Sequence, residues 1–516
     1  MNLPSIILEN AHLRGNRLAI LDDEGRFTWS QFTDRVSRAA GLLIGKGLRP
    51  GERFAILMRN GFRNAELLWA GYWAGIVPVP INWRLSPLEI AAILEDSGAK
   101  LIACASEFAP LMNSAPLAPW RERVVSIEAA AGERAQYEAL IAAAEPAPMR
   151  DSDGNLDAIL LYTSGTTGRG KGVRLTQGNI IADAWQNGLA LGLRPDDIYM
   201  HVAPMFHSAD LNGTLCFLLG CGHVYLAQFT AGGMFAAIER HRVTVTNLVP
   251  TMVKVMAEDP QADQFDVSTL RLIYYGSSPM PLEWLSAART RFPGVAWYQG
   301  YGLTETSPIL TAMDHESHLK CFESGDLTRL KSVGVPVAGV QMRIVDDQDR
   351  PLPTGGTGEV VVRGPNVSPG YFNRDAENAQ AFRGGWFHTG DVGRFDEDGL
   401  LYLVDRKKDV IITGGENVYS TEVEAALFRH PDIAEAAVIG VPDDTLGEAL
   451  FAVIAPQRGK TLAAEDVIAH CRQYIGGFKV PRKMVFVEAL PRTALGKVQK
   501  NLLRQKYRKP GRTGSD

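Results

Sequence analysis

Several classes of protein are excluded by what this 516-residue sequence lacks. Its five cysteines are scattered and none stands in a C-x-x-C pair, which argues against a disulfide framework or a structural zinc site and favours a reducing compartment. No run of about 18 uninterrupted apolar residues is present, so we expect no membrane span. The opening residues, MNLPSIILEN, have neither the basic segment nor the apolar run of a signal peptide. The expectation is a soluble, cytoplasmic protein.

An excess of positive charge is also missing. The formal net charge of -5 at pH 7 gives no electrostatic reason to expect nucleic acid as a partner. The hydrophobic content of 46% and the charged content of 22% are those of a globular protein with a large core. At about 150 residues per domain, the length suggests roughly two to four domain-sized units. The sequence does not decide the oligomeric state, and a homodimer is one arrangement that it allows.

Helical and strand patterns alternate through the first half of the chain. Apolar residues recur at helical spacing in 27–48 and 65–76, and short apolar strands are expected at 53–58, 245–250 and 270–276. This alternation predicts α/β layers built on parallel sheet. Past Lys331 the pattern changes to short strands joined by Asp, Pro and Gly, which indicates hairpins. From about Asp409 onward we expect a smaller α+β unit.

The stretch TSGTTGRGKG, residues 163–172, is close to a phosphate-binding P-loop. It has the G-x-x-x-x-G-K spacing, but Gly172 stands where a P-loop has the Ser or Thr that holds magnesium. An apolar strand precedes it, a period-two stretch follows it, and the helix signal begins only at Thr176. We therefore expect a strand–loop–strand arrangement in which backbone N–H groups, hydroxyls and Lys171 surround phosphate. Taken alone, the motif is explained equally well by a mobile surface turn.

Four further stretches fit the phosphate-binding interpretation. They are YYGSSPM (274–280), QGYGLTETSP (299–308), WFHTGDVGRFDEDGLLYLVDRKKDVIITGGEN (386–417) and PRTALGKVQK (491–500). Together with the loop at 163–172 they resemble the AMP-forming adenylate superfamily, which includes acyl- and aryl-CoA synthetases, firefly luciferase and the adenylation domains of peptide synthetases. The motifs occur in the family's order and span most of the chain.

The resemblance implies an ATP site. Tyr301 would cover the adenine, Thr304 would lie near the α-phosphate, and Glu305 would hold Mg²⁺, which needs few protein ligands. Asp391 would accept hydrogen bonds from both ribose hydroxyls, and Arg406 would contact ribose or phosphate. The remaining nucleotide contacts implied are Thr163, Ser164, Gly165, Thr166, Thr167, Lys171, Gly276, Ser277, Ser278, Gln299 and Gly302. Gly170 departs from the family, which usually has proline there.

The resemblance also implies a fold and a division of the chain. The fold is α/β: a large N-terminal domain of layered α/β subdomains with a small β-barrel-like part, and a small mobile α+β C-terminal domain. The large domain would span 1–404, the hinge 405–408 with Lys408 as the hinge residue, and the small domain 409–516. Lys497 would be the catalytic lysine, and Gly414 and Gly415 would line the CoA channel. The neighbouring lysines, such as Lys500, are best explained as surface charge.

The acid substrate is narrowed by PMFHSADLNG, residues 204–213. Amino-acid-activating domains have an aspartate in the corresponding F-D-x-S pattern to bind the substrate amine, whereas this chain has His207. A neutral histidine does not pair with an ammonium group in that way, so α-amino acids are disfavoured, and His207 would lie near the carboxylate. The acid pocket implied consists of Ala209, Leu211, Gly213, Gly300, Leu303 and Pro308. Without an Arg or Lys for a second carboxylate, an apolar monocarboxylic acid, fatty or aryl, is favoured.

The reaction implied is that of an AMP-forming acid–CoA ligase. Acid and ATP would give acyl-AMP and diphosphate, and CoA would then give acyl-CoA and AMP. Because carboxylate and triphosphate repel each other, Lys497, Lys171 and Mg²⁺ on Glu305 would have to neutralise charge. Two alternatives stay open: an adenylate-forming enzyme that loads a carrier protein, and a non-catalytic nucleotide-binding homologue.

The role of Lys497 gives the first prediction. The substitution Lys497→Ala should nearly abolish adenylate formation, because the charge between carboxylate and α-phosphate is lost, yet spare thioester formation from supplied acyl-AMP. Single-turnover assays of the two half-reactions measure both rates. Equal loss in both half-reactions would rule out this role.

Overall fold

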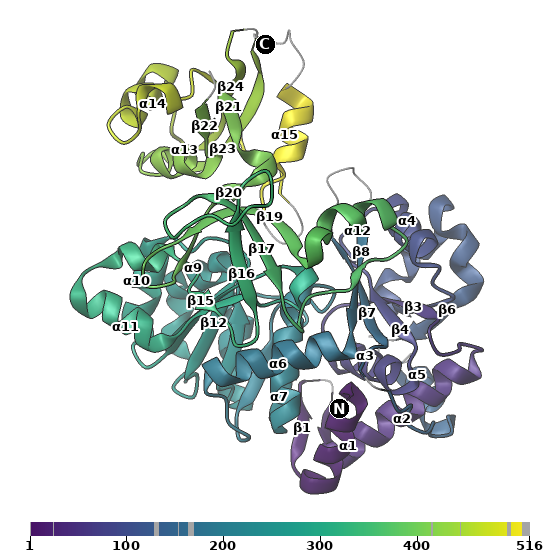
Figure 1. The fold of residues 1–516 in the computed structure, drawn as a ribbon. Helices are drawn as coiled ribbons and strands as arrows, with labels where there is room; N and C mark the ends of the chain where they lie inside the picture. The colour runs from purple at the N-terminus through teal and green to yellow at the C-terminus, as the bar shows by residue number, and fades with distance from the viewer. Residues whose placement is uncertain are drawn as a thin grey trace. The chain divides into compact units, whose positions relative to one another are not determined.

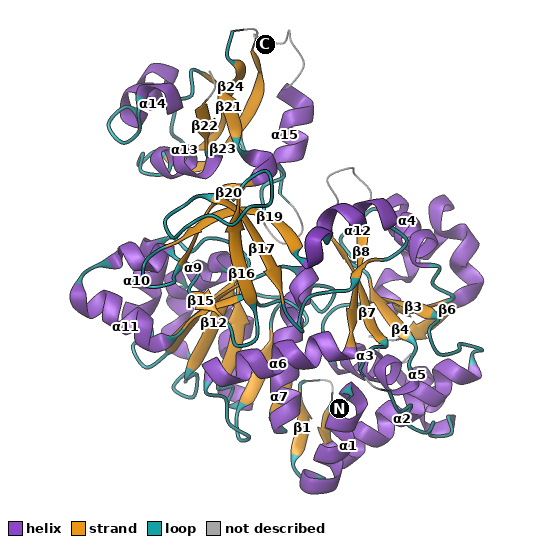
Figure 2. Ribbon diagram, viewed as in Figure 1, coloured by secondary structure: helices purple, strands orange, loops and turns teal. Residues whose placement is uncertain are grey.

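The computed structural model describes residues 2–23, 25–127, 134–152, 154–163, 170–413, 416–443, 445–492 and 497–507 (Figure 1). The chain forms two compact units, the first made of residues 1–342 and 362–387 and the second of residues 343–361 and 388–516. Figure 2 shows sheets flanked by helices in each of them. This mixed α/β architecture confirms the predicted fold class. The predicted division at 405–408 stays a prediction.

A nine-stranded sheet is the largest element of the first unit. Its middle strands are parallel to their neighbours, and antiparallel pairs close both edges. In sheet order the strands are β15 (Val335–Pro336), β14 (Thr311–Met313), β13 (Ala296–Tyr301), β12 (Leu272–Gly276), β11 (Val245–Leu248), β9 (Ile198–His201), β10 (Gly222–Tyr225), β1 (Leu18–Leu21) and β2 (Arg26–Thr28).

Alternation along the strands assigns the two faces of this sheet. Ile273, Tyr275 and Trp297 point into a buried cluster with one group of helices, whereas Tyr274 and Tyr298 alternate to the other face, where their rings lie 5.3 Å apart. The helices of the first group are α8 (Ala231–His241), α9 (Pro250–Glu258), α10 (Leu282–Arg291) and α11 (His315–Ser324). Since the carboxyl ends of parallel strands share one edge, residues that follow β12 and β13 are brought together there.

Two smaller sheets complete the first unit. The parallel sheet β4 (Val77–Pro80), β3 (Arg53–Leu57), β5 (Leu101–Ala105) and β6 (Val124–Ile127) is accompanied by helices α4 (Pro87–Ser97) and α5 (Arg134–Ala143). The antiparallel sheet β18 (Gly370–Tyr371), β8 (Lys171–Thr176) and β7 (Asp157–Thr163) contains the strands on both sides of the predicted phosphate loop. Helix α6 (Gln177–Leu191) begins after its N-cap Thr176, so the predicted strand–loop–strand arrangement is confirmed.

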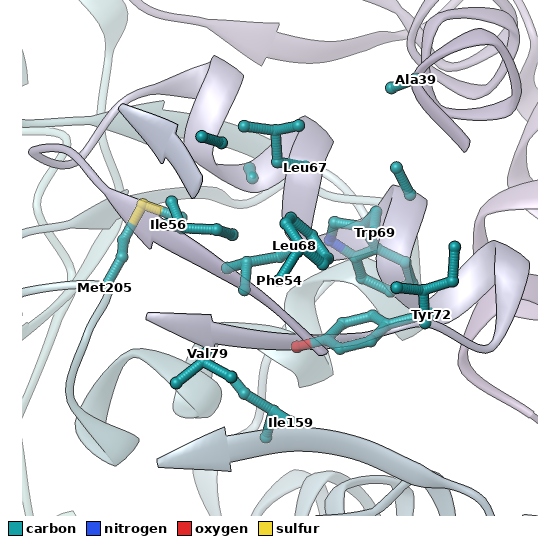
Figure 3. Close-up of a cluster of buried hydrophobic side chains, with 14 of the residues drawn as sticks. Ala39, Phe54, Ile56, Leu67, Leu68, Trp69, Tyr72, Val79, Ile159 and Met205 are labelled. Carbon is teal, nitrogen blue, oxygen red and sulfur yellow. The ribbon is translucent and has the colours of Figure 1, made fainter. Parts of the chain in front are cut away.

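The hydrophobic core between these sheets is organised by three helices, α1 (Leu3–Arg14), α2 (Trp29–Gly45) and α3 (Phe62–Ala74). Every residue of α3 is buried, and Trp29 and Phe32 of α2 are fully buried. Figure 3 shows Leu68, Trp69 and Tyr72 of α3 in this core, with Met205 from the segment after β9. The core continues to helix α7 (Thr214–Leu219), so the segment between β9 and α7 lies against α3.

The second unit contains a four-stranded sheet and a smaller α+β body. The first sheet has the order β16 (Gln341–Val345), β17 (Gly358–Arg363), β19 (Phe387–Phe395) and β20 (Leu401–Arg406). The other has the order β22 (Glu416–Val418), β21 (Ile411–Thr413), β24 (Gly447–Pro456) and β23 (Ile433–Asp443), with β25 (Lys483–Phe486) parallel to β24. Its helices are α13 (Ser420–Leu427), α14 (Ala464–Cys471) and α15 (Lys500–Tyr507).

Within the described part of the chain, no helix is both long and apolar enough to cross a bilayer.

The remaining helix of the first unit is α12 (Asp375–Ala381), which follows β18.

A buried ion pair ties α2 to α3. The Glu66 carboxylate is fully buried, receives the Arg35 guanidinium at 2.5 Å, and accepts a hydrogen bond from the Tyr137 hydroxyl at 2.6 Å. Burial raises the pKa of Glu66 in spite of its positive partner. Removing one member of such a pair leaves a desolvated charge without compensation.

We therefore predict that Arg35→Met destabilises the protein by about 3–5 kcal/mol, measured by urea unfolding. The matched control is Arg240→Met, because Arg240 pairs with Asp23 at 2.7 Å but both side chains are more than half exposed. The control should cost less than about 1 kcal/mol. Similar losses in the two variants would contradict the assignment of Arg35 to a buried pair.

Candidate active site

Two loops at the carboxyl edge of the large sheet meet through a pair of hydroxyls. The 3₁₀ turn Ser208–Gly213 follows β9, and the 3₁₀ turn Thr304–Thr306 follows β13. The Ser208 and Thr304 hydroxyl oxygens lie 3.2 Å apart, and Ser208 is buried. The structure therefore brings the predicted catalytic residue Thr304 beside the segment that carries His207, a contact between residues 96 positions apart.

His207 caps the first of these turns. Its Nδ1 accepts a hydrogen bond from the Ala209 N–H at 3.2 Å, and the residue is half-buried. An accepting Nδ1 places the proton of a neutral ring on Nε2, so the ring has a donor on the side away from the turn. The role predicted for His207 beside the substrate carboxylate stays a prediction.

Tyr371 connects the predicted metal ligand to the predicted phosphate-binding lysine. The Tyr371 hydroxyl donates to Glu305 Oε1 at 2.9 Å, and Lys171 Nζ lies 4.9 Å from the centroid of the Tyr371 ring. Tyr371 and Glu305 are both about nine-tenths buried. One side chain thus fixes a carboxylate and places a cation near it, in a region where charge interactions are poorly screened.

Sequence reasoning missed Tyr371. Strand β18 pairs with β8 in the register Tyr371↔Val173, and the Phe372 N–H donates to the Gly172 carbonyl at 2.8 Å. The signal in the sequence was an aromatic residue after a Ser-Pro-Gly turn in SPGYFN, residues 368–373, which by itself indicates only a turn. Pairing with β8 over a separation of almost 200 residues is what gives Tyr371 its position.

Asn366 holds the loop after β13. Its amide nitrogen donates to the Thr306 carbonyl at 2.9 Å and to the Ile309 carbonyl at 2.6 Å, and the residue is fully buried. The backbone of Glu305 is also held, because the Ser368 N–H donates to its carbonyl at 2.8 Å. Hydrogen bonds from Asn366 and Ser368, just before β18, therefore hold the backbone of the TETSP turn and with it the position of Glu305.

Three predicted glycines allow close approach of neighbouring groups. A Cβ on Gly276 would lie 2.3 Å from the Gly300 carbonyl oxygen, one on Gly300 would lie 1.9 Å from the Tyr274 hydroxyl, and one on Gly302 would lie 1.9 Å from the Pro308 carbonyl oxygen. Any side chain at these positions would displace the strand ends that form the edge of the site. Packing alone therefore requires glycine here, whatever the ligand.

The other predicted nucleotide contacts of the first unit lie at the same strand ends. Tyr301 closes β13 and is buried, and Gln299 accepts from the Tyr275 hydroxyl at 3.3 Å. Ser277 follows β12 with a left-handed backbone (φ 71°) and is exposed together with Ser278, while Thr163 ends β7 opposite Lys171. The remaining predicted loop residues, Ser164, Gly165, Thr166 and Thr167, lie outside the described residues, as do Gly414 and Gly415.

The predicted acid-pocket residues line the two turns. Ala209 and Leu211 are buried in the turn after β9, and a Cβ on Gly213 would lie 2.5 Å from His201 Cε1. Leu303 stands directly before the turn Thr304–Thr306, and Pro308 is buried just after it. The structure brings the two turns together at Ser208 and Thr304, so these residues belong to adjoining segments.

In the second unit, Asp391 and Arg406 form an ion pair. They are opposite each other in the β19–β20 ladder, and Arg406 Nε lies 2.6 Å from Asp391 Oδ1. Asp391 is almost buried, whereas the Arg406 side chain is 43% exposed. Both were predicted to contact ribose or phosphate; the ion pair brings them together, and that role stays a prediction.

The hinge residue Lys408 precedes the first strand of the α+β body. It lies in a short 3₁₀ turn, and burial lowers the pKa of its ammonium group. Lys497, the predicted catalytic lysine, is exposed and lies three residues before α15.

The interpretation of Lys500 as surface charge is wrong. Its ammonium group lies 2.7 Å from Glu424 and 2.6 Å from the Ser420 hydroxyl, and its side chain is only 14% exposed. The physical reason is that α15 packs against β23 in the core of the small body, so its first residue meets α13. Lys500 is a structural ion-pair partner that anchors the helix after Lys497.

The predicted Mg²⁺ is consistent with the donor set around Glu305. Among the described residues no group of three or more His, Cys, Asp or Glu side chains could hold an ion, so a dedicated protein cage is not formed there. Magnesium on a nucleotide is usually held by one or two carboxylates, phosphates and water. Glu305 supplies one such carboxylate, with one oxygen occupied by Tyr371.

Comparison with known proteins shows the family. The AMP-binding enzyme family model matches residues 7–372, and the AMP-binding enzyme C-terminal domain matches residues 422–497. The chain therefore belongs to the AMP-binding enzyme family. It is an enzyme of the acid–thiol ligase class that forms AMP.

Similar relatives match along almost the whole chain. A feruloyl-CoA synthase of an Amycolatopsis species is 36% identical over 505 residues, covering 97% of this chain and 98% of that protein. A 2-succinylbenzoate–CoA ligase of Bacillus cereus (strain ATCC 10987) is 33% identical over 510 residues, covering 98% of each.

Two solved structures have the same fold. The o-succinylbenzoate CoA synthetase of Bacillus subtilis, in complex with its acyl-adenylate intermediate, superposes with a TM-score of 0.85 at 30% identity over 99% of each chain. The ATP-bound MatB of Rhodopseudomonas palustris superposes with a TM-score of 0.87 at 29% identity over 98% of this chain and 99% of that one. The predicted family and reaction class, with ATP and CoA as substrates, are confirmed.

The link from Tyr371 to Glu305 gives a prediction. In Tyr371→Phe the hydrogen bond to the carboxylate is lost, so adenylate formation should slow about tenfold to a hundredfold and need more Mg²⁺ for half-maximal rate. ATP–diphosphate exchange at a series of Mg²⁺ concentrations measures both. The control Tyr402→Phe, on β20 beside Arg394, should leave both unchanged. An unaltered Mg²⁺ requirement in Tyr371→Phe would refute the link.

Proposed function

We propose that the protein is an AMP-forming CoA ligase for an aromatic monocarboxylic acid. The observation that supports the proposal best is the contact of Tyr371 with both Lys171 and Glu305. The turn that carries Glu305 also contacts the segment of His207, through the hydroxyls of Thr304 and Ser208. This arrangement collects a cation, a carboxylate for nucleotide-bound Mg²⁺ and two hydroxyls at one strand edge. The aromatic class is supported by the relatives named for feruloyl and 2-succinylbenzoate substrates.

In the proposed first half-reaction, a carboxylate oxygen of the acid attacks the α-phosphorus of ATP and diphosphate leaves. His207 Nε2–H and Lys497 hold the carboxylate, Thr304 hydrogen-bonds the α-phosphate, and Lys171 neutralises the leaving phosphates. Glu305 would hold Mg²⁺, which supplies further positive charge on the phosphates. No general base is needed because the nucleophile is already ionised, so positioning and charge neutralisation carry the rate.

In the proposed second half-reaction, the thiol of CoA attacks the acyl carbon and AMP leaves with the bridging oxygen. The adenosine is held through Tyr301 and through Asp391 with its partner Arg406. Turning about Lys408 between the large domain and the small domain would withdraw Lys497 and present the segment 412–418 to the thiol.

We also propose that the enzyme works in the cytoplasm. All five cysteines are unpaired and buried, as expected for a protein kept in a reducing environment. A homodimer is proposed as its assembly and is tested by light scattering.

A panel of acids with ATP and CoA tests the proposed function. Benzoic and cinnamic acids should release AMP and form acyl-CoA faster than fatty acids of similar size. Faster turnover of fatty acids would reject the aromatic class while keeping the ligase reaction. No ATP–diphosphate exchange with any acid would favour the non-catalytic homologue, and thioester formation only on a phosphopantetheinylated carrier would favour carrier loading.

A further inference from the structure

A small cavity lies inside the core of the first unit, between α3 and the turn that follows β9. Its volume is about 30 Å³. Since one water needs about 10–15 Å³ of such space, the cavity has room for one or two small groups but not for an aromatic ring. Figure 3 shows the α3 side, where Leu68, Trp69 and Tyr72 lie in one cluster with Met205.

The opposite wall of the cavity is polar. Asp210 and His201 both line it, and Asp210 Oδ1 lies 2.7 Å from His201 Nδ1. His201 Nε2 is in turn 3.0 Å from Nδ1 of the fully buried His223. A carboxylate has about four acceptor positions, so Asp210 can still accept a hydrogen bond after its contact with His201. A carboxylate that can accept a further hydrogen bond therefore lines the cavity.

A second polar group in this wall has no partner. Tyr225 lines the cavity, the residue is 7% exposed, and its hydroxyl oxygen forms no hydrogen bond within the described structure. The ring of Tyr225 is fixed by stacking on His201, at a centroid distance of 4.4 Å. A buried hydroxyl without a partner costs about 1–3 kcal/mol, so folding alone does not account for a tyrosine here.

The cavity adjoins the predicted acid pocket. Leu211 and Gly213, two of the pocket residues, also line the cavity, and Asp210 stands between Ala209 and Leu211 in the same turn. His207 begins this turn, so the carboxylate position and the cavity lie at one short segment of chain. An acid held at His207 would extend along the turn toward Asp210.

We propose that the cavity is the inner end of the acid pocket and binds a hydroxyl group that the aromatic acid carries at the end remote from its carboxylate. The hydroxyl would donate a hydrogen bond to Asp210 and accept one from the Tyr225 O–H, which has no partner within the described structure. This inference rests on the proposed function, because it assumes that an aromatic acid occupies the pocket.

Other terminal groups fit the cavity less well. A second carboxylate would be repelled by Asp210, and an ammonium group would lose its hydration in a space that offers few acceptors. A methyl group is close to a hydroxyl in size but leaves the Tyr225 hydroxyl without a partner. Sites built to hydrogen-bond a substrate hydroxyl discriminate strongly against the analogue that lacks it, for this reason.

The test compares matched acids with the full-length enzyme. The probes are 4-hydroxycinnamic, 4-methylcinnamic and cinnamic acids, and the corresponding benzoic acids, so that two distances from the carboxylate are sampled. The measured quantity is kcat/KM for ATP-dependent acyl-CoA formation. In the wild type, the hydroxylated member of at least one series should exceed its methyl partner about tenfold or more.

Two conservative variants test whether the cavity causes the preference for hydroxyl acids over methyl acids. Tyr225→Phe removes only the unpartnered oxygen and should reduce the hydroxyl-to-methyl ratio about tenfold, while kcat/KM for the methyl acid is kept or raised. Asp210→Asn should reduce the ratio in the same way. The control is Tyr137→Phe, which removes a buried hydroxyl of the same core that bonds Glu66 and does not line the cavity; it should leave the ratio unchanged.

The outcomes separate this inference from the proposed function. Ligase activity with a ratio near one in the wild type, or a ratio that Tyr225→Phe leaves unaltered, overturns the hydroxyl site and leaves the ligase in place; the cavity then holds water only. A preference for the methyl acids also overturns it. Activity with none of the acids rejects the aromatic class itself. Because the readout is a ratio on one variant, partial loss of folded protein does not affect it.

Discussion

Carboxylate and triphosphate are both anions, and their mutual repulsion is the constraint on which this structure depends. At about 4 Å, two unit charges of like sign repel by several kcal/mol where solvent is largely excluded. In the described part of the first unit, Lys171 lies beside Tyr371, and the Tyr371 hydroxyl holds Glu305, the residue predicted to bind the Mg²⁺ that would neutralise charge. Lys171, Tyr371 and Glu305 come from β8, from β18 and from the turn after β13. The packing of these strands and this turn brings the charged side chains together.

The sequence indicated the class of reaction better than it indicated the residues that hold the site in position. Local patterns identified the strand–loop–strand arrangement around the predicted phosphate loop, because it depends on neighbours in the chain. Tyr371 was missed because its position comes from pairing with β8, far away in sequence. Lys500 was misinterpreted for a similar reason, since its partner Glu424 is brought by the packing of α15 on β23. The roles of all the predicted site residues, Lys497, Asp391 and Lys408 among them, stay predictions.

The buried polar groups near the turn after β9 bear on the choice of acid and not on the binding of ATP. Membership of the family follows from motifs that surround ATP, and these motifs are the same whatever the acid. The pair formed by Asp210 and His201, with the hydroxyl of Tyr225, lies in an otherwise apolar core and is not needed for nucleotide chemistry. We propose that these groups in the core beside Leu211 select the acid; sequence spacing gives no signal of them, because Asp210, His201 and Tyr225 come together only through packing.

The central claim is that the acid is activated by direct attack of its carboxylate on the α-phosphorus. Turnover of an acid labelled with ¹⁸O in both carboxylate oxygens tests it, with the products analysed by mass spectrometry. Attack at the α-phosphorus followed by thiol attack at the acyl carbon transfers one labelled oxygen to AMP and leaves diphosphate unlabelled. Unlabelled AMP, or label in inorganic phosphate or diphosphate, would contradict the account.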